Sequence, residues 1–228
     1  MKTILLLLGL FLVVKVLVGL GKKFSKAPVP PLHIHLIPVP ASSYSDFART
    51  HRKELENLGF RLIGAYQITE MKGLDMVAFS NPTQAVCAIV YRHPVVKVFV
   101  DMVSMTHDDQ SLTVTTAPAG GNLDQKPGHR KIFVTSLPTP LMLERLLADR
   151  PHGNYRILDE SNFQQVFEQA YEREMAWRHG RGGVTMDEVR REAAAMGIES
   201  SDVVLEATRK LQKEYAQEYA SSARRDPR

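Results

Sequence analysis

The feature that most constrains this chain is an apolar run from Thr3 to Gly21, which contains a single charge, Lys15. As a helix rising 1.5 Å per residue, the run spans roughly 28 Å, about the thickness of the hydrocarbon core of a bilayer. Lys15 costs about 2.5 to 3.5 kcal/mol at a helix centre, whereas the aliphatic and Phe side chains between Ile4 and Leu20 contribute roughly 4 to 8 kcal/mol in favour of insertion. The run therefore predicts a transmembrane anchor over residues 1–21, in contact with lipid through residues 3–21.

A cleaved signal peptide is the alternative interpretation of the same segment. Lys2 would be its charged region, residues 3–14 its apolar region, and Gly19 with Gly21 the small residues of a cleavage site. The apolar run continues past Lys15, and a cluster of lysines follows it, which favours a retained anchor. These are Lys22, Lys23 and Lys26. These three lysines exceed the positive charge before the run, which is Lys2 and the amino terminus, by about one. By the positive-inside rule this excess favours a single-pass membrane protein with a cytoplasmic C-terminal domain.

The charge of the chain is concentrated at its N-terminus. The chain carries a net charge of +4, and its first 26 residues contain five lysines and no acid, so the remainder carries −1. Non-specific binding to nucleic acid needs basic charge gathered on the folded part, so this balance argues against a nucleic-acid partner. The chain has one cysteine, which excludes an intramolecular disulfide and a cysteine-rich metal site.

Residues 22–41 read as a proline-rich stalk, with a short edge strand expected at Leu32 to Ile37. Its prolines are Pro28, Pro30, Pro31, Pro38 and Pro40. Ser43 and Asp46 then begin a helix with apolar residues at helical spacing, and Gly59 is a natural residue to end it.

From Arg61 to Ser136 the pattern changes to six short runs rich in β-branched and aromatic residues. Most of the separators are too short for crossover helices, so we expect a mainly antiparallel meander. Alternation in Val95 to Val103 predicts that Val98 and Val100 face the core while Phe99 and Asp101 lie on a partly solvated face. An α+β sheet domain is thus expected over residues 42–136.

A helical region is expected over residues 137–220. Leu141 to Asp149 predicts a short helix, and three more follow. Ser161 with Gln164 is expected to cap the second, and Thr185 with Glu188 the third, which would end at Gly197. The fourth begins at Ser200 or Ser201, and residues 221–228 are expected to be disordered. The fold class is therefore α+β, with the anchor, the stalk, a helix plus meander sheet, and a helical C-terminal part.

Histidine and aspartate are the candidates for chemistry. His33 and His35 are two positions apart on an extended segment, so their side chains would point the same way. Two such histidines can contribute to a metal site, but two ligands alone do not make one. Further ligands, or the acid and base of a hydrolase, would come from the loops, and no spacing requires them to converge. The loop candidates are His93, His107, Asp108, Asp109 and His129. No metal site and no cofactor is predicted.

The remaining motifs favour structural roles. Cys87 lies in an apolar strand, where a thiol behaves as a small hydrophobe. Residues 117–122 contain two glycines without the Gly-Lys-Ser/Thr of a phosphate loop, so a flexible loop is expected. The single RGG within residues 178–183 predicts a helix stop and linker. A helix-turn-helix over residues 185–213 is disfavoured because its second helix begins with acidic and small polar residues.

No catalytic motif occurs in this chain, so an enzyme is not established. We expect a membrane-anchored binding or interaction module that receives a protein or an apolar ligand on its sheet face or its C-terminal helices. The alternative is a membrane-anchored hydrolase-like enzyme that uses loop histidines and aspartates. Convergence of His33, His35, His107, Asp108 and His129 would favour the enzyme, and dispersal the binding module.

Overall fold

A computed structural model describes residues 30–40, 42, 45–94, 97–118 and 120–195, together with single positions and short stretches between 206 and 220. The chain divides into two compact units. Among the described residues, unit 1 contains those from 34 to 118 and from 125 to 171, and unit 2 contains residues 30–33, 120–124 and those from 172 onward. The predicted anchor, residues 22–29 and 41 of the predicted stalk, and the C-terminal tail lie outside the described residues.

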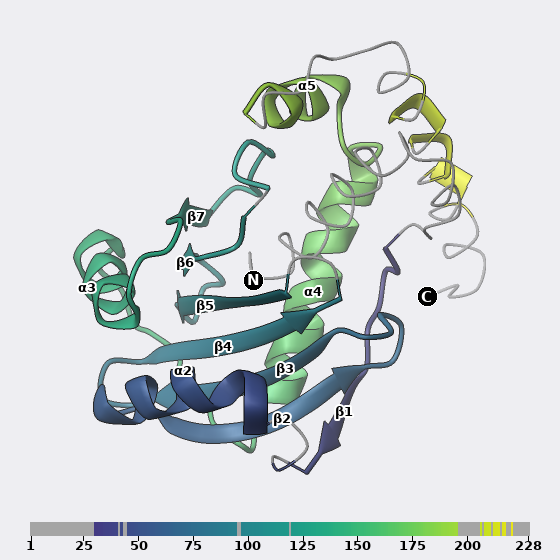
Figure 1. The fold of residues 1–228 in the computed structure, drawn as a ribbon. Coiled ribbons are helices and arrows are strands. Elements are labelled where there is room, and N and C mark those ends of the chain that lie inside the picture. The colour runs from purple at the N-terminus through teal and green to yellow at the C-terminus, as the bar shows by residue number, and fades with distance from the viewer. Residues whose placement is uncertain are drawn as a thin grey trace. The chain divides into compact units, whose positions relative to one another are not determined.

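Unit 1 is built on one seven-stranded sheet whose spatial order follows the chain order (Figure 1). Its strands are β1 (Leu36–Val39), β2 (Arg61–Ile68), β3 (Asp75–Asn81), β4 (Val86–His93), β5 (Lys97–Met105), β6 (Ser111–Thr115) and β7 (His129–Phe133). Neighbours pair antiparallel from β1 to β6, and β6 pairs parallel with β7. The mainly antiparallel sheet is therefore confirmed. The parallel pair follows a connection of residues 116–128, which has the length such pairing requires.

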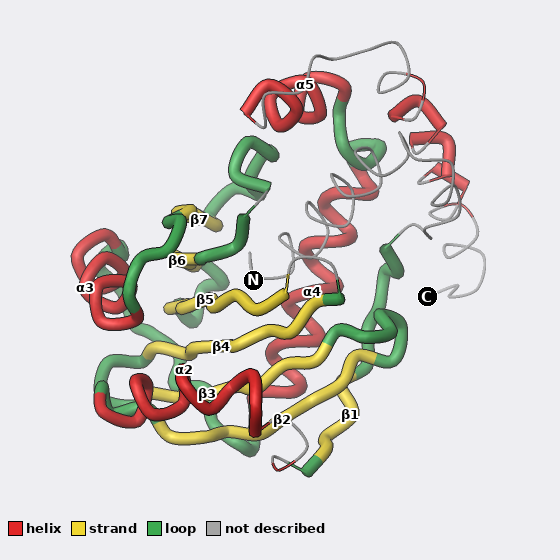
Figure 2. The backbone as a smooth tube through the Cα atoms, viewed as in Figure 1, coloured by secondary structure: helices red, strands yellow, loops and turns green. Residues whose placement is uncertain are grey.

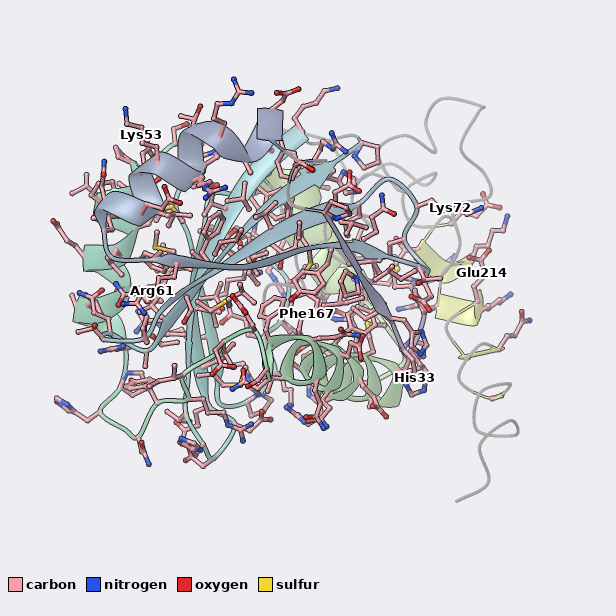
Figure 3. All side chains as sticks on the ribbon, turned by 90° about the horizontal axis from the view of Figure 1, so that it is seen from below. His33, Lys53, Arg61, Lys72, Phe167 and Glu214 are labelled. Carbon is pink, nitrogen blue, oxygen red and sulfur yellow. The ribbon has the colours of Figure 1, made fainter. Side chains whose placement is uncertain are left out.

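Helices cover both faces of this sheet. The helices α2 (Ser45–Asn57) and α3 (Thr139–Asp149) bury Leu55 and Leu146 in a cluster with Phe79 and Val100 on one face. The first part of α4 (Phe163–Gly180) packs on the other face, where the ring of Phe163 lies 5.3 Å from that of Tyr66. Figure 3 shows Lys53 of α2 and Phe167 of α4 on opposite sides of the sheet. Unit 1 is thus an α+β arrangement with a buried sheet.

The helix boundaries test the predicted caps. Gly59 ends α2 with a φ of +85°, which a residue without a Cβ adopts readily. Thr185 and Glu188 form the reciprocal capping box at the start of α5 (Met186–Ala195): each backbone N–H donates to the other side chain. The cap predicted at Ser161 and Gln164 is wrong. Gln164 instead donates to the carbonyl of Leu36, 3.0 Å away.

The expectation that one face of β5 is partly solvated is wrong. Phe99 and Asp101 are buried, as are Val100 and Met102 on the opposite face, whereas Val98, expected in the core, is 39% exposed. Helices on both faces explain this burial, because a sheet covered on both sides has no solvated face. The alternating pattern of residues in one strand does not show whether helices also cover the second face of the sheet.

Side chains bond the backbone N–H and carbonyl of one residue in each edge strand. At β1, the Leu36 N–H donates to Glu168 and its carbonyl accepts from Gln164. At β7, the Gln125 side chain accepts from the Lys131 N–H at 3.0 Å and donates to the Lys131 carbonyl at 3.3 Å. The edge strand expected at Leu32 to Ile37 is observed slightly later, at Leu36–Val39.

In the part of the chain that the structure describes, no helix has both the length and the apolar character needed to cross a bilayer. The anchor predicted over residues 1–21 lies outside that part. Gly182 and Gly183, with φ of +81° and +84°, follow the end of α4 and donate to the carbonyls of His179 and Arg178. These bonds confirm the helix stop predicted for the RGG triplet.

Candidate functional site

Several polar side chains lie together at the turn between β5 and β6 in unit 1. The backbone N–H of Thr106 donates to the carbonyl of Gln110 at 2.8 Å, which closes the turn. Asp109 adopts a φ of +68°, a conformation that aspartate tolerates better than most residues. Asp108 accepts hydrogen bonds from the Thr106 hydroxyl and the Gln110 amide. The turn interpretation of this acidic pair is therefore confirmed.

Three residues at this end of the sheet form a serine, histidine and aspartate cluster. Ser111, the first residue of β6, lies directly opposite His129, the first residue of β7, and its Oγ is 3.0 Å from Nδ1 of the ring. The other ring nitrogen, Nε2, is 3.8 Å from Oδ2 of Asp109. Lys126 Nζ approaches the same carboxylate at 3.6 Å. The side chain of His129 is only 2% exposed.

This cluster has the residue types of a catalytic triad but not its full geometry. Such a triad needs a base within hydrogen-bond reach of the nucleophile and an acid that orients the base. The Ser111 and His129 side chains satisfy the first condition, whereas the Asp109 separation of 3.8 Å exceeds a hydrogen bond. Both Ser111 and His129 are buried. The arrangement can hold the β6–β7 pair together as described, and it could activate a hydroxyl only if substrate reached it.

The connection between α3 and α4, residues 150–162, has no helix or regular strand and is drawn as loop in Figure 2. Hydrogen bonds join it to the turn between β5 and β6. The His107 N–H donates to the carbonyl of Asn154 at 3.0 Å, and the Arg156 N–H donates to the carbonyl of Met105 at 2.8 Å. Thr106 and Tyr155 form an isolated antiparallel bridge. The connection therefore continues the hairpin rather than crossing the surface freely.

Arg150 and Gly153 contribute further contacts of this connection. Arg150 donates to the Gln84 carbonyl at 2.6 Å and to the Ser104 hydroxyl at 3.1 Å, and its guanidinium lies 4.4 Å from the ring centre of Tyr155. At Gly153, an added Cβ would come within 3.0 Å of the Thr106 side chain, so glycine permits the close approach. We define the loop surface as residues 106–110 and 150–158; its exposed members include His107, His152, Asn154 and Ile157.

The histidines of the extended segment have separate partners. Nδ1 of His35 is 2.6 Å from Oε1 of Glu70, and the same carboxylate accepts the His35 N–H. The hydrogen bond with Glu70 raises the pKa of His35. Nδ1 of His33 lies 3.7 Å from Glu172. The structure thus provides no shared site for the pair.

The other candidates are distributed along the sheet. His93 pairs with Lys97 at the first residue of β5, whereas Asp109 and His129 lie near the last residue, Met105. Burial lowers the pKa of His93. Cys87 is buried in β4, and burial raises the pKa of its thiol to about 12. A thiol of that pKa is not a nucleophile at neutral pH.

Sequence reasoning missed two features. Ser111 carries no motif, and its contact with His129 depends on a long-range strand pairing that the sequence does not specify. The segment 117–122, expected to be a flexible loop, is bound at Gly120 and Asn122 by the carboxylate of Glu192. The spacing of Glu188 and Glu192, one helical turn apart, was the available signal.

Among the described residues, no group of three or more His, Cys, Asp or Glu side chains could hold a metal ion. Comparisons of the chain with protein-family models, with curated proteins and with solved structures find no match. The geometry of the sites is therefore the basis for any functional proposal.

Proposed function

We propose that this chain is a membrane-anchored binding module, held at a bilayer by residues 1–21, whose loop surface receives a protein partner. The anchor rests on the length and composition of the apolar run, since the energy of inserting its side chains exceeds the cost of Lys15. The binding role rests on the organisation of unit 1. A fixed loop cluster on a rigid sheet is where proteins commonly carry recognition.

The single observation that carries the proposal is the ordered connection 150–162. Connections of this length without secondary structure are uncommon in compact domains and usually serve a function. Its backbone bonds to Met105 and His107 hold it in place, and Ile157 is 48% exposed on it. A preformed loop with an exposed aliphatic side chain binds a partner with less loss of conformational entropy than a flexible loop does.

The separate partners of the polar residues support binding rather than catalysis. His35 contacts Glu70, Asp108 contacts Thr106 and Gln110, and His129 contacts Ser111. These bonds hold local backbone segments together. The His35 contact lies beside β1, at the opposite edge of the sheet from β7, and the Asp109 carboxylate stays 3.8 Å from the His129 ring, so these residues do not form a complete set of acid, base and nucleophile.

Site-specific photocross-linking tests the proposal. Ile157 and Ile37 are both about half exposed, at 48% and 49%, and Ile37 lies on the edge strand β1. A photoreactive residue at position 157 of the full chain in its native membranes should give a discrete adduct with another protein, and the matched residue at position 37 should not. Equal labelling at both positions, or no adduct at 157, would contradict a partner site on the loop surface.

A membrane-anchored hydrolase is the second candidate, and the contact between Ser111 Oγ and His129 Nδ1 favours it. A fluorophosphonate that labels activated serines distinguishes the two functions in the full chain. Covalent labelling that is lost in Ser111→Ala would support the hydrolase and overturn the binding module. We expect no labelling, because Ser111 is buried and the Asp109 carboxylate does not reach hydrogen-bond distance of the ring.

A further inference from the structure

In unit 2, the carboxylate of Glu192 on α5 is held by donors of residues 120–124. Oε1 accepts the Gly120 N–H at 2.6 Å, and Oε2 accepts the Asn122 N–H at 3.0 Å and the Asn122 side-chain amide at 3.1 Å. Gly120 has a φ of +95°, a conformation that few residues other than glycine adopt. Backbone N–H groups that converge in this way form an anion-binding nest.

Charged side chains extend the nest. Oε1 of Glu188 accepts the Asp124 N–H at 2.8 Å and lies 3.2 Å from the Arg178 guanidinium. Arg191 donates to the Asn122 carbonyl and to the Asp124 carboxylate. Arg178 also donates to the Asp124 carbonyl at 3.0 Å. The backbone N–H groups of Gly120, Asn122 and Asp124 therefore all donate to a carboxylate of α5.

Among the side chains that these hydrogen bonds and ion pairs join, the charges balance when Glu192 is counted. Arg178, Arg181 and Arg191 supply the positive charges, and they lie beside Asp124 and Glu188. With the Glu192 carboxylate present the two signs are equal in number, and without it one positive charge is in excess. A nest of N–H donors with a positive excess attracts anions.

The docking of α5 depends on these carboxylates more than on apolar burial. Its buried side chains are Glu188, Val189, Glu192 and Ala193, so only two small apolar groups contribute. A helix of ten residues is marginal in isolation, so its contacts must hold it. Loss of the Glu192 contact should therefore release much of the helix.

We propose that residues 120–124 form a carboxylate-binding site that Glu192 fills as an internal ligand, and that a carboxylate of a partner peptide exchanges with it and frees α5. The ligand class follows from the donors, because three N–H groups divided over two oxygens match a bidentate carboxylate. An acidic side chain or a chain terminus supplies the same group. This site is separate from the loop surface and does not depend on the function proposed for it.

Hydrogen exchange in the full chain, solubilised in detergent, tests the internal ligand. Glu192→Gln should raise amide exchange across α5 by about tenfold while β3 and β4 stay protected. Asp187→Asn is the matched control, because Asp187 lies on the same helix, is exposed, and pairs only locally with Arg190 in the described structure. Unchanged protection of α5 in Glu192→Gln would overturn the proposal.

Acetate tests the proposed carboxylate-binding site of residues 120–124 directly. In Glu192→Ala, acetate at constant ionic strength should restore protection of α5 or shift the Gly120 amide resonance in a saturable way, and inorganic phosphate should act more weakly. The wild type should respond to neither anion at the same concentrations. If Glu192→Ala does not fold, the titration is made on Glu192→Gln. A non-saturable or equal response to all anions would mean general salt effects and would overturn a specific carboxylate site.

Discussion

Ser111 Oγ lies 3.0 Å from Nδ1 of His129, and the two residues are directly opposed in the parallel β6–β7 pair. Their contact is a consequence of strand register, since opposed residues on one face of neighbouring strands lie within side-chain reach. The imidazole joins this strand pair to the Asp109 carboxylate of the preceding turn. The cluster therefore links the turn that bears the loop surface to the last strand of the sheet.

Ser111→Ala should destabilise the chain by about 1 to 3 kcal/mol, because it removes a hydrogen bond between buried side chains. Chemical denaturation measures the change. Thr83→Ala, in the exposed β3–β4 turn, is the control and should stay within about 0.5 kcal/mol of the wild type. A Ser111→Ala variant as stable as this control would show that the bond contributes nothing.

Arg178→Met should cost about 3 to 5 kcal/mol, because it leaves the fully buried Glu188 without its nearest cation. Arg190→Met removes an exposed ion pair, the one with Asp187 on α5. The change should lower the free energy of unfolding by less than about 1 kcal/mol. Trp177, the single tryptophan, lies against Arg178 and reports unfolding of this region by fluorescence. Similar losses of stability in the two variants would show that the buried ion pair contributes no more than the exposed one.

The contact between His35 and Glu70 should stabilise the fold more at low pH. The hydrogen bond with Glu70 raises the pKa of His35 above its usual value of 6.5. While Glu70 is ionised, this contribution is complete below pH 6.5 and is lost as the pH rises through the raised folded-state value. NMR titration of the His35 ring measures this directly, and Glu70→Gln should return the pKa toward 6.5. A wild-type pKa at or below 6.5 would refute the contact.

Cys87 should resist alkylation in the native chain at pH 8. Burial raises its pKa to about 12, so almost no thiolate is present, and the side chain is only 2% exposed. Mass spectrometry after maleimide treatment should show one modification in denaturant and none without it. Rapid labelling under native conditions would mean that β4 opens readily.

The N-terminal segment should be retained in the mature protein. The apolar run continues past Lys15, and Gly19 with Gly21 makes a poor cleavage site. Intact-mass measurement of the protein from the membrane fraction should therefore give the full chain, less at most its initiator methionine. A mature chain that starts near Lys22 would establish the signal peptide instead.

Local signals predicted most of the secondary structure. The six runs between Arg61 and Ser136 became β2 to β7, and Gly59 and the Thr185–Glu188 box ended and began helices as expected. These features depend on residues a few positions apart, whose propensities act within one element. The sequence was therefore sufficient where the physical cause is local.

Long-range relationships were not predictable in the same way. The burial of Asp101 depends on helices packed over both faces of the sheet, and the contact between Ser111 and His129 depends on the register of β6 and β7. The Glu192 contact joins positions 70 or more residues apart in the chain. The pattern of residues within one segment does not indicate which distant backbone N–H groups will donate to a carboxylate.

The side-chain bonds at Leu36 and Lys131 determine how this sheet can meet other molecules. Gln164 and Glu168 occupy the outward groups of Leu36, and Gln125 occupies those of Lys131, so an incoming strand finds these positions already bonded. Pro38 removes a further donor from β1. Copies of this protein at high concentration should therefore resist joining edge to edge into a continuous sheet, the route by which exposed edges lead to aggregation.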